Sequence, residues 1–250
     1  MSGIIRRGFA TFARSVIPLE PGLVHIQNFL SLKEQIALTH LALEEGKKEG
    51  RGFWTVDQEL NCTENRGRIF DAINTFPEDF FSTSMDALKL AKGVDDTLSS
   101  PDPTHMILLY YESIGEAPHI PWHQDNGEND GEGTHPVVSI SLGDTCEFPL
   151  CHTKPQTSAN HPLSNPKNLA HRVTLRSGDA LIFGGDCRYL WHSIYTIYLQ
   201  SAPEELPIQG ARLNFTFRHA PEILGKEASF KTIDPNIEND NQFFKLSEMK

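Results

Sequence analysis

The stretch from Arg212 to Arg218, RLNFTFR, alternates strictly between polar and apolar side chains. Because successive side chains of a strand point to opposite faces, this alternation predicts a β-strand with two chemically opposite faces. The polar face consists of Arg212, Asn214, Thr216 and Arg218. Two interpretations of that face are open. It can meet water on a half-exposed strand, or it can point into a barrel and bind something there.

The rest of the chain sets that strand among other strands. Short β-rich runs separated by Gly, Pro and Asn clusters occupy its second half: HMILLYYES, IPWHQD, HPVVSISLGD, HRVTL, ALIFGG, WHSIYTIYL and RLNFTFRHA. This arrangement predicts an antiparallel barrel or jelly roll rather than parallel βαβ units. Before these strands, LVHIQNFLS is expected to form a strand that ends at Ser31. Two helices are also expected there, over residues 32–48 with Ser31 as cap and over residues 76–93 with Pro77 near the start. The fold class is therefore mainly β or α+β, with N-terminal helices buttressing one sheet.

Composition limits the classes of function. The 250 residues are 38% hydrophobic and 22% charged, with no apolar run long enough for a membrane span, so we expect no stable membrane association and a monomer. Four cysteines without a CxxC pair indicate neither a disulfide scaffold nor a zinc knuckle, which favours an intracellular protein. The net charge of −11 argues against nonspecific coating of nucleic acid but leaves room for a small basic patch.

The N-terminus has a character of its own. The first nineteen residues contain three arginines and no acid, with Ile5, Phe9, Phe12 and Val16 at helical spacing. This pattern is typical of an amphipathic mitochondrial presequence, and the alternative is a short surface helix packed on the domain. The expected location is the cytoplasm or nucleus. The presequence-like pattern adds mitochondrial targeting as a second option.

Three residues form a candidate metal site. His123 and Asp125, in WHQD, lie two apart, so both side chains point the same way on a strand or its extended exit. His192 follows in a later strand-like run, after the Gly184-Gly185 turn. Two imidazoles and one carboxylate on one face of a metal leave three positions open, the arrangement of non-haem Fe(II) oxygenases.

The two arginines of RLNFTFR fit such a site. Six residues apart, Arg212 and Arg218 are separated by about 20 Å along an extended strand, so they cannot bind the same small group. One guanidinium can bind a distal carboxylate while the other neutralises charge near the metal. A small dicarboxylate cofactor fits between them.

With these motifs in place, the sequence resembles the AlkB-like Fe(II)/2-oxoglutarate-dependent dioxygenases. HQD, PVVSISLG, SGDALIFGGDCRYLWHSI and RLNFTFR occur in the family's order and cover roughly residues 105 to 220. The resemblance implies a double-stranded β-helix that removes alkyl groups from DNA or RNA bases with Fe(II), 2-oxoglutarate and O2, releasing formaldehyde, succinate and CO2. It implies iron ligation by His123, Asp125 and His192.

The resemblance also assigns roles to other residues. Arg212 would pair with the distal carboxylate of 2-oxoglutarate, and Arg218 would lie near its metal-chelating end. Asn214, Thr216 and Tyr111 would complete the cofactor pocket. Trp54 matches the aromatic residue of the family's substrate lid, where stacking would hold a flipped base; the alternative is a core aromatic.

The chain departs from the family at two places. Leu109 stands where an Asn commonly precedes the pocket tyrosine, and the acid that follows the metal aspartate is Glu128, after Gly127, instead of lying two positions on. Glu128 is nevertheless expected, with Trp54, on the substrate side of the site.

These observations give a domain layout and leave two rival functions. We expect an N-terminal extension over residues 1–20 and helices with a substrate lid over 21–100. The jelly-roll core follows over 101–225, and a polar tail over 226–250. One rival is an AlkB-like oxygenase acting on a protein or a lipid-derived molecule, which the acidic net charge favours mildly. The other is a non-catalytic jelly-roll module that binds a metal.

Overall fold

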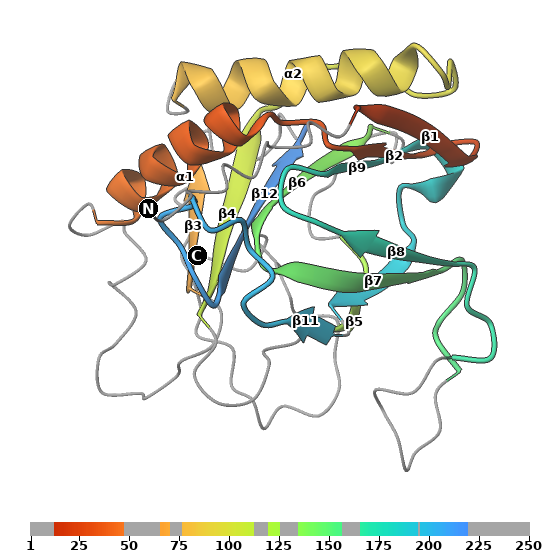
Figure 1. The fold of residues 1–250 in the computed structure, drawn as a ribbon. Coiled ribbons are helices and arrows are strands. Elements are labelled where there is room, and N and C mark those ends of the chain that lie inside the picture. The colour runs from red at the N-terminus through yellow and green to blue at the C-terminus, as the bar shows by residue number, and fades with distance from the viewer. Residues whose placement is uncertain are drawn as a thin grey trace, which may run out of the picture.

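Two β-sheets packed face to face form the body of the protein, and two helices lie across the outer side of the larger sheet (Figure 1). The computed structural model describes residues 13–47, 66–70, 77–112, 120–125, 135–156, 166–194 and 196–219. For residues 66–70 and for Tyr111, Glu112 and Pro121 it describes the backbone alone. The arrangement is the jelly roll with buttressing N-terminal helices that the sequence predicts.

The larger sheet has seven strands, and all its pairings are antiparallel. In spatial order they are β1 (Ser15–Glu20), β2 (Leu23–Gln27), β9 (Ala180–Phe183), β6 (Val137–Gly143), β12 (Ala211–Arg218), β4 (His105–Glu112) and β3 (Arg66–Phe70). The RLNFTFR stretch thus lies in β12, between β4 and β6, near the middle of the sheet.

The smaller sheet faces it with five strands. Its order is β11 (Thr196–Tyr198), β7 (Thr145–Cys151), β10 (Trp191–Ile194) and β5 (Ile120–His123), and β8 (His171–Leu175) also pairs with β7. A short 3-10 turn, η3 (Gly185–Cys187), leads from β9 of the larger sheet toward β10 of the smaller one. Consecutive segments therefore pass from one sheet to the other, as the jelly roll requires.

Both helices begin and end where the sequence places them, within two residues. Helix α1 (Leu32–Gly46) has Ser31 as N-cap: the Ser31 hydroxyl accepts from the Glu34 amide, and the Glu34 carboxylate accepts from the Ser31 amide at 2.7 Å. This reciprocal capping box satisfies two backbone donors. Helix α2 (Glu78–Lys92) starts after Pro77 and carries acids in its first turn and lysines in its last, which complements the helix dipole.

The N-terminal segment differs from its helical pattern. Val16 lies in strand β1, paired with Ile26 of β2, so strand pairing overrides the local helical spacing at that position. Residues 1–12 lie outside the described ranges, and a targeting role stays a prediction. Strand β2 ends at Gln27, four residues before the expected end at Ser31, because Asn28 adopts a left-handed turn conformation with φ +51°.

Three strands have no counterpart among the predicted ones: β1, β3 and β7. Strand β7 reads TCEFPLC, in which Pro149 interrupts the usual strand pattern. The strand forms because β8, β10 and β11 pair with it. In the parts of the chain that the structure describes, neither helix is long and apolar enough to cross a bilayer.

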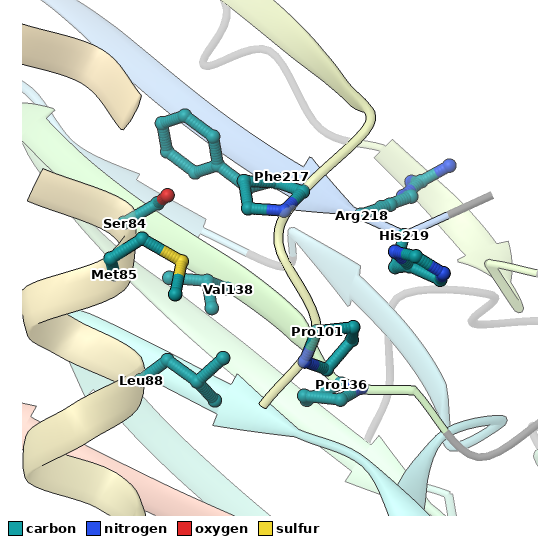
Figure 2. A pocket seen from close by; sticks show the side chains of 10 residues that line it. Ser84, Met85, Leu88, Pro101, Pro136, Val138, Phe217, Arg218 and His219 are labelled. Atoms are coloured by element: carbon teal, nitrogen blue, oxygen red, sulfur yellow. The ribbon is translucent and has the colours of Figure 1, made fainter. Parts of the chain in front are cut away.

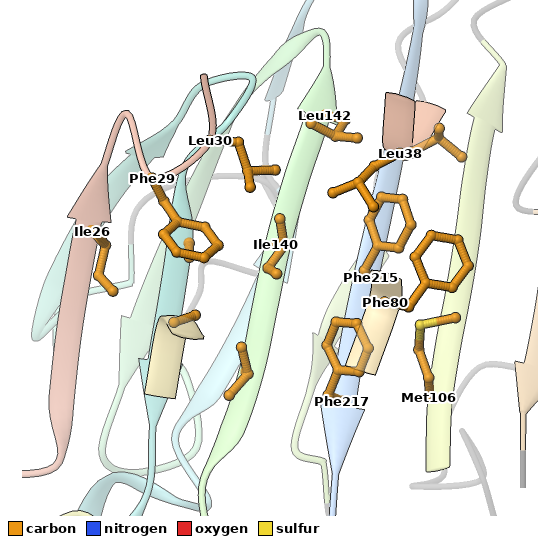
Figure 3. Close-up of a cluster of buried hydrophobic side chains, with 14 of the residues drawn as sticks. Ile26, Phe29, Leu30, Leu38, Phe80, Met106, Ile140, Leu142, Phe215 and Phe217 are labelled. Carbon is orange, nitrogen blue, oxygen red and sulfur yellow. The ribbon is translucent and has the colours of Figure 1, made fainter. Parts of the chain in front are cut away.

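Strand β12 separates two cores. Its apolar face packs toward the helices, where Phe215 lies 5.2 Å from the ring of Phe80 in α2, and Leu38 of α1 joins the same cluster (Figure 3). The second core lies between the sheets and includes Phe148, Leu150 and Phe183. All eight residues of β12 are buried, so the half-exposed interpretation of its polar face is wrong. That face points into the protein.

Candidate metal and cofactor site

Two neighbouring strands of the smaller sheet bring the two candidate metal-ligating histidines together. Strand β5 ends at His123 and strand β10 contains His192, and the two residues are direct partners in the antiparallel register. Their ring centroids lie 4.3 Å apart. Phe148 stacks against His192 at 5.2 Å, and Phe183 lies at 5.6 Å, so the aromatic residues of the inner core hold this imidazole in place.

Asp125 completes the group. It lies two residues beyond the end of β5, and its Oδ1 atom is 3.8 Å from Nε2 of His123 and 3.8 Å from Nε2 of His192. The possible ligand atoms of the three residues all lie within 4.8 Å of one another. Among the described residues, this is the one set of three such side chains that comes so close. The structure thus brings together the three residues that the sequence predicts to share one site, and their role as iron ligands stays a prediction.

The protonation of His192 suits a metal ligand. Its Nδ1 atom lies 2.9 Å from the carbonyl oxygen of Leu190, and donation of a hydrogen bond there leaves the lone pair of Nε2 directed at the group. Burial, together with the neighbouring imidazole of His123, lowers the pKa of His192 to about 4. The ring is therefore neutral near pH 7, as coordination requires.

The carboxylate of Asp125 is held in its charged form. Burial by itself would raise its pKa, but the cation of Arg218, whose Nη2 atom lies 2.7 Å from Oδ1, and the two histidines hold the pKa well below its usual range. Two imidazole nitrogens and one anionic oxygen form the facial set typical of non-haem Fe(II) oxygenases. The residues present therefore fit an Fe(II) ion.

The polar face of β12 leads from this group into the interior. Arg212 is fully buried and donates to the Ser141 hydroxyl at 2.7 Å, and Asn214 donates to the Ser139 hydroxyl at 2.9 Å. Thr216 in turn donates to the Asn214 side-chain oxygen at 2.7 Å. These bonds hold Arg212, Asn214 and Thr216 along the polar face, and Arg218 at its other end is held by Asp125.

The remaining predicted site residues are placed only in part. The backbone of Tyr111 lies in β4 directly opposite Arg212, where it is expected beside the cofactor, but its side chain lies outside the described part of the chain. Trp54 and Glu128 also lie outside the described residues, so their substrate roles stay predictions.

The two glycines at the start of η3 serve different purposes. Gly185 has φ +52°, a left-handed conformation that favours glycine. Gly184 is extended, but a Cβ atom there would lie 2.9 Å from Cβ of Pro136. Gly185 thus allows the turn, and Gly184 allows the close approach to Pro136. The chain then continues into β10, which contains His192.

Two residues near the metal ligands have no role in the sequence-based assignment. Arg188 is buried and donates from Nη1 to the carbonyl oxygen of Asp125 at 2.6 Å, and Gln124 donates to the carbonyl oxygen of Tyr189 at 2.5 Å. An arginine between the glycine pair and the metal histidine is the only local signal. Nothing in the sequence indicates that it reaches a residue 63 positions earlier.

A separate hollow lies between α2 and the end of β12. Its walls include Met85, Leu88, Pro101 and Phe217, and Arg218 also contributes (Figure 2). In Figure 2 the Arg218 side chain points away from Met85 and Leu88. The hollow is lined mainly by apolar side chains, so it does not suit a dicarboxylate.

Comparison with known proteins agrees with this site. Residues 22–218 match the model of the 2OG-Fe(II) oxygenase superfamily, and the chain belongs to that family of Fe(II)- and 2-oxoglutarate-dependent dioxygenases. Within the family it is AlkB-like. It is similar to the Arabidopsis thaliana DNA N(6)-methyladenine demethylase ALKBH1C, with 28% identity over 237 residues, 80% of this chain and 49% of that protein. ALKBH1D of the same plant, also named a DNA N(6)-methyladenine demethylase, is 35% identical over 123 residues, 47% of this chain and 25% of that protein.

Solved structures give the same relationship. The structure of OsALKBH1 superimposes with a TM-score of 0.64 at 25% identity, covering 82% of this chain and 99% of that one. The non-haem α-ketoglutarate-dependent epimerase SnoN shares the fold, with a TM-score of 0.51 at 16% identity over 88% of this chain and 92% of that one. The chain spans about half the length of the first of its curated relatives and a quarter of the second.

Proposed function

We propose that this protein oxidatively demethylates N-methylated bases of nucleic acid, with N6-methyladenine in DNA as the first candidate. The observation that carries the proposal is the His123–Asp125–His192 group joined through Arg218 to the buried polar face of β12. Two curated relatives named as DNA N(6)-methyladenine demethylases support the choice of base.

His123, Asp125 and His192 would hold the iron through Nε2, a carboxylate oxygen and Nε2. Bound Fe(II), with 2-oxoglutarate and O2, supplies the oxidation that converts an N-methyl group to N–H plus formaldehyde while 2-oxoglutarate becomes succinate and CO2. One oxygen atom of O2 goes to succinate and the other to formaldehyde, so the reaction balances without a further reductant. The protein's own contribution is binding and orientation.

The polar face of β12 would hold 2-oxoglutarate. Arg212, fully buried beside the Ser141 hydroxyl, would fork onto the distal carboxylate, since a planar guanidinium matches a carboxylate with two donors. Arg218, already bound to Asp125, would balance negative charge near the metal. Asn214 and Thr216, which are hydrogen-bonded to each other, would line the space between.

The test is succinate release by the purified protein with Fe(II), ascorbate and 2-oxoglutarate, using DNA and RNA oligonucleotides that each carry one methylated base. We expect N6-methyladenine DNA to stimulate turnover in the wild type and to have no effect on His123→Ala. His152→Ala is the matched control, because His152 is half-exposed and lies outside the metal group. It should behave as the wild type.

Other outcomes separate the rival functions. Slow succinate release that no oligonucleotide changes would leave the oxygenase site intact and remove the nucleic acid substrate, and proteins would then be tested. A metal-binding module without turnover would make no succinate at all. Such a module has no need for a 2-oxoglutarate site, so binding of 2-oxoglutarate by the wild type and its loss in Arg212→Met would argue against it.

A further inference from the structure

Two hydrogen bonds join the segment that carries Asp125 to the segment that precedes His192. Arg188 donates from Nη1 to the backbone carbonyl of Asp125 at 2.6 Å, and Gln124 donates from Nε2 to the backbone carbonyl of Tyr189 at 2.5 Å. Each segment thus provides one donor side chain and one acceptor carbonyl. We call this reciprocal pair, formed by residues 124–125 and 188–189, the ligand clasp.

The clasp lies where strand pairing ends. In the register of β5 with β10, His123 pairs directly with His192, but Asp125 lies beyond the last residue of β5. The position of the carboxylate ligand is therefore not set by the ladder that aligns the two histidines. The bond from Arg188 acts on the backbone of Asp125 itself, and so it can set the direction of that side chain.

Arg188 is placed for this task. The residue is 1% exposed, and its guanidinium lies over the Tyr189 ring at 5.0 Å, which restricts its rotamer. Burying a guanidinium is costly unless its donors are used. The bond to Asp125 is one such use, in a region where the backbone carbonyl is also buried.

We infer that Arg188 is a positioning residue for the metal site. Together with Gln124, it fixes the backbone of Asp125 so that the carboxylate faces the two imidazoles before the metal binds. This inference rests on the proposed function insofar as Asp125 is taken as an iron ligand. Residues that orient metal ligands in this way typically change metal affinity or activity by about 10–100-fold when they are replaced.

The test measures metal affinity and not turnover. Co(II) is titrated into the metal-free protein and followed by its visible absorption. Co(II) is used because it reacts less readily with O2 at this kind of site than Fe(II) does. We expect Arg188→Met to raise the Kd for Co(II) by about 10–100-fold and to change the spectrum, with partial recovery in Arg188→Lys. Gln124→Met should raise the Kd in the same direction. Arg176→Met, which removes an exposed guanidinium, is the matched control and should leave the Kd for Co(II) and the spectrum unchanged.

The outcomes distinguish this inference from the proposed function. A folded Arg188→Met protein that binds Co(II) within about twofold of the wild type, with the same spectrum, overturns the inference alone. If Arg188→Met does not unfold cooperatively, and so is not properly folded, Gln124→Met provides the test. An unchanged Kd for Co(II) in Gln124→Met then overturns the inference. Wild-type protein that binds Co(II) no better than His123→Ala overturns the proposed function, and the inference with it.

Discussion

Replacing Arg218 by methionine removes the cation that lies 2.7 Å from Oδ1 of Asp125, where both side chains are about 95% buried. The carboxylate would then be left in the interior without its closest cation, beside the imidazoles of His123 and His192. Breaking a buried ion pair by removing one partner typically costs about 3–5 kcal/mol. We therefore expect the free energy of unfolding of the metal-free protein to fall by that amount in Arg218→Met.

For a chain of this length each kcal/mol corresponds to about 2–4 °C, so the melting temperature should fall by about 6–20 °C. The assay is equilibrium urea unfolding in the presence of a chelator, with Arg176→Met as control. Added Co(II) should reduce the difference in stability between Arg218→Met and the wild type, because a cation at the histidine–aspartate group replaces the lost charge.

A double-mutant cycle isolates the pair itself. In an Asp125→Asn background, the further change Arg218→Met should cost less than in the wild type, with a coupling of about 1–3 kcal/mol. If metal-free Arg218→Met unfolds within about 1 kcal/mol of the wild type, or the cycle shows no coupling, the account of charge balance at this site is wrong.

Three further predictions follow from other contacts. Phe215→Ala should lower the free energy of unfolding by about 3–5 kcal/mol, measured by urea unfolding, because it opens a cavity beside Phe80; a loss below about 1 kcal/mol would contradict the packing described. Arg212→Met should raise the KM for 2-oxoglutarate by about 10–100-fold, the equivalent of about 1.4–2.8 kcal/mol of charge-assisted hydrogen bonding, and an unchanged KM would remove Arg212 from the cofactor site. Burial tends to raise the pKa of Asp95, but hydrogen bonds from Thr97 and from the Gly22 amide outweigh it and hold that pKa below its ordinary range. The stability that Asp95 contributes is therefore present at neutral pH and lost as the pH falls below about 4, so the deficit of Asp95→Asn in unfolding experiments should shrink over that range.

Local patterns predict much of the fold because several segments carry their own signals. Strand β12 has a strict two-residue alternation, and α1 has a capping box formed by Ser31 and Glu34. Strand β7 has no such signal, since Pro149 lies within it and its pairing with three other strands is a tertiary effect. The same applies to β1, where pairing with β2 replaces the helical spacing of Val16.

The candidate site, like the fold, is predictable from the sequence only in part. His123 and Asp125 are predictable because their spacing alone places them on one side of an extended segment, and His192 joins them through strand pairing. The sequence order alone does not reveal that Arg218 binds Asp125 or that Arg188 reaches its carbonyl, since these contacts link segments 63 or more residues apart. Such contacts depend on how the two sheets close, which no local pattern encodes.

The most direct test of the central claim is the ratio of formaldehyde to succinate released from DNA that carries N6-methyladenine. Demethylation by the His123–Asp125–His192 site predicts one formaldehyde for each succinate produced above the substrate-free background, and neither product from Asp125→Ala. Succinate without formaldehyde, or formaldehyde that persists in Asp125→Ala, would contradict the claim that this site demethylates that base.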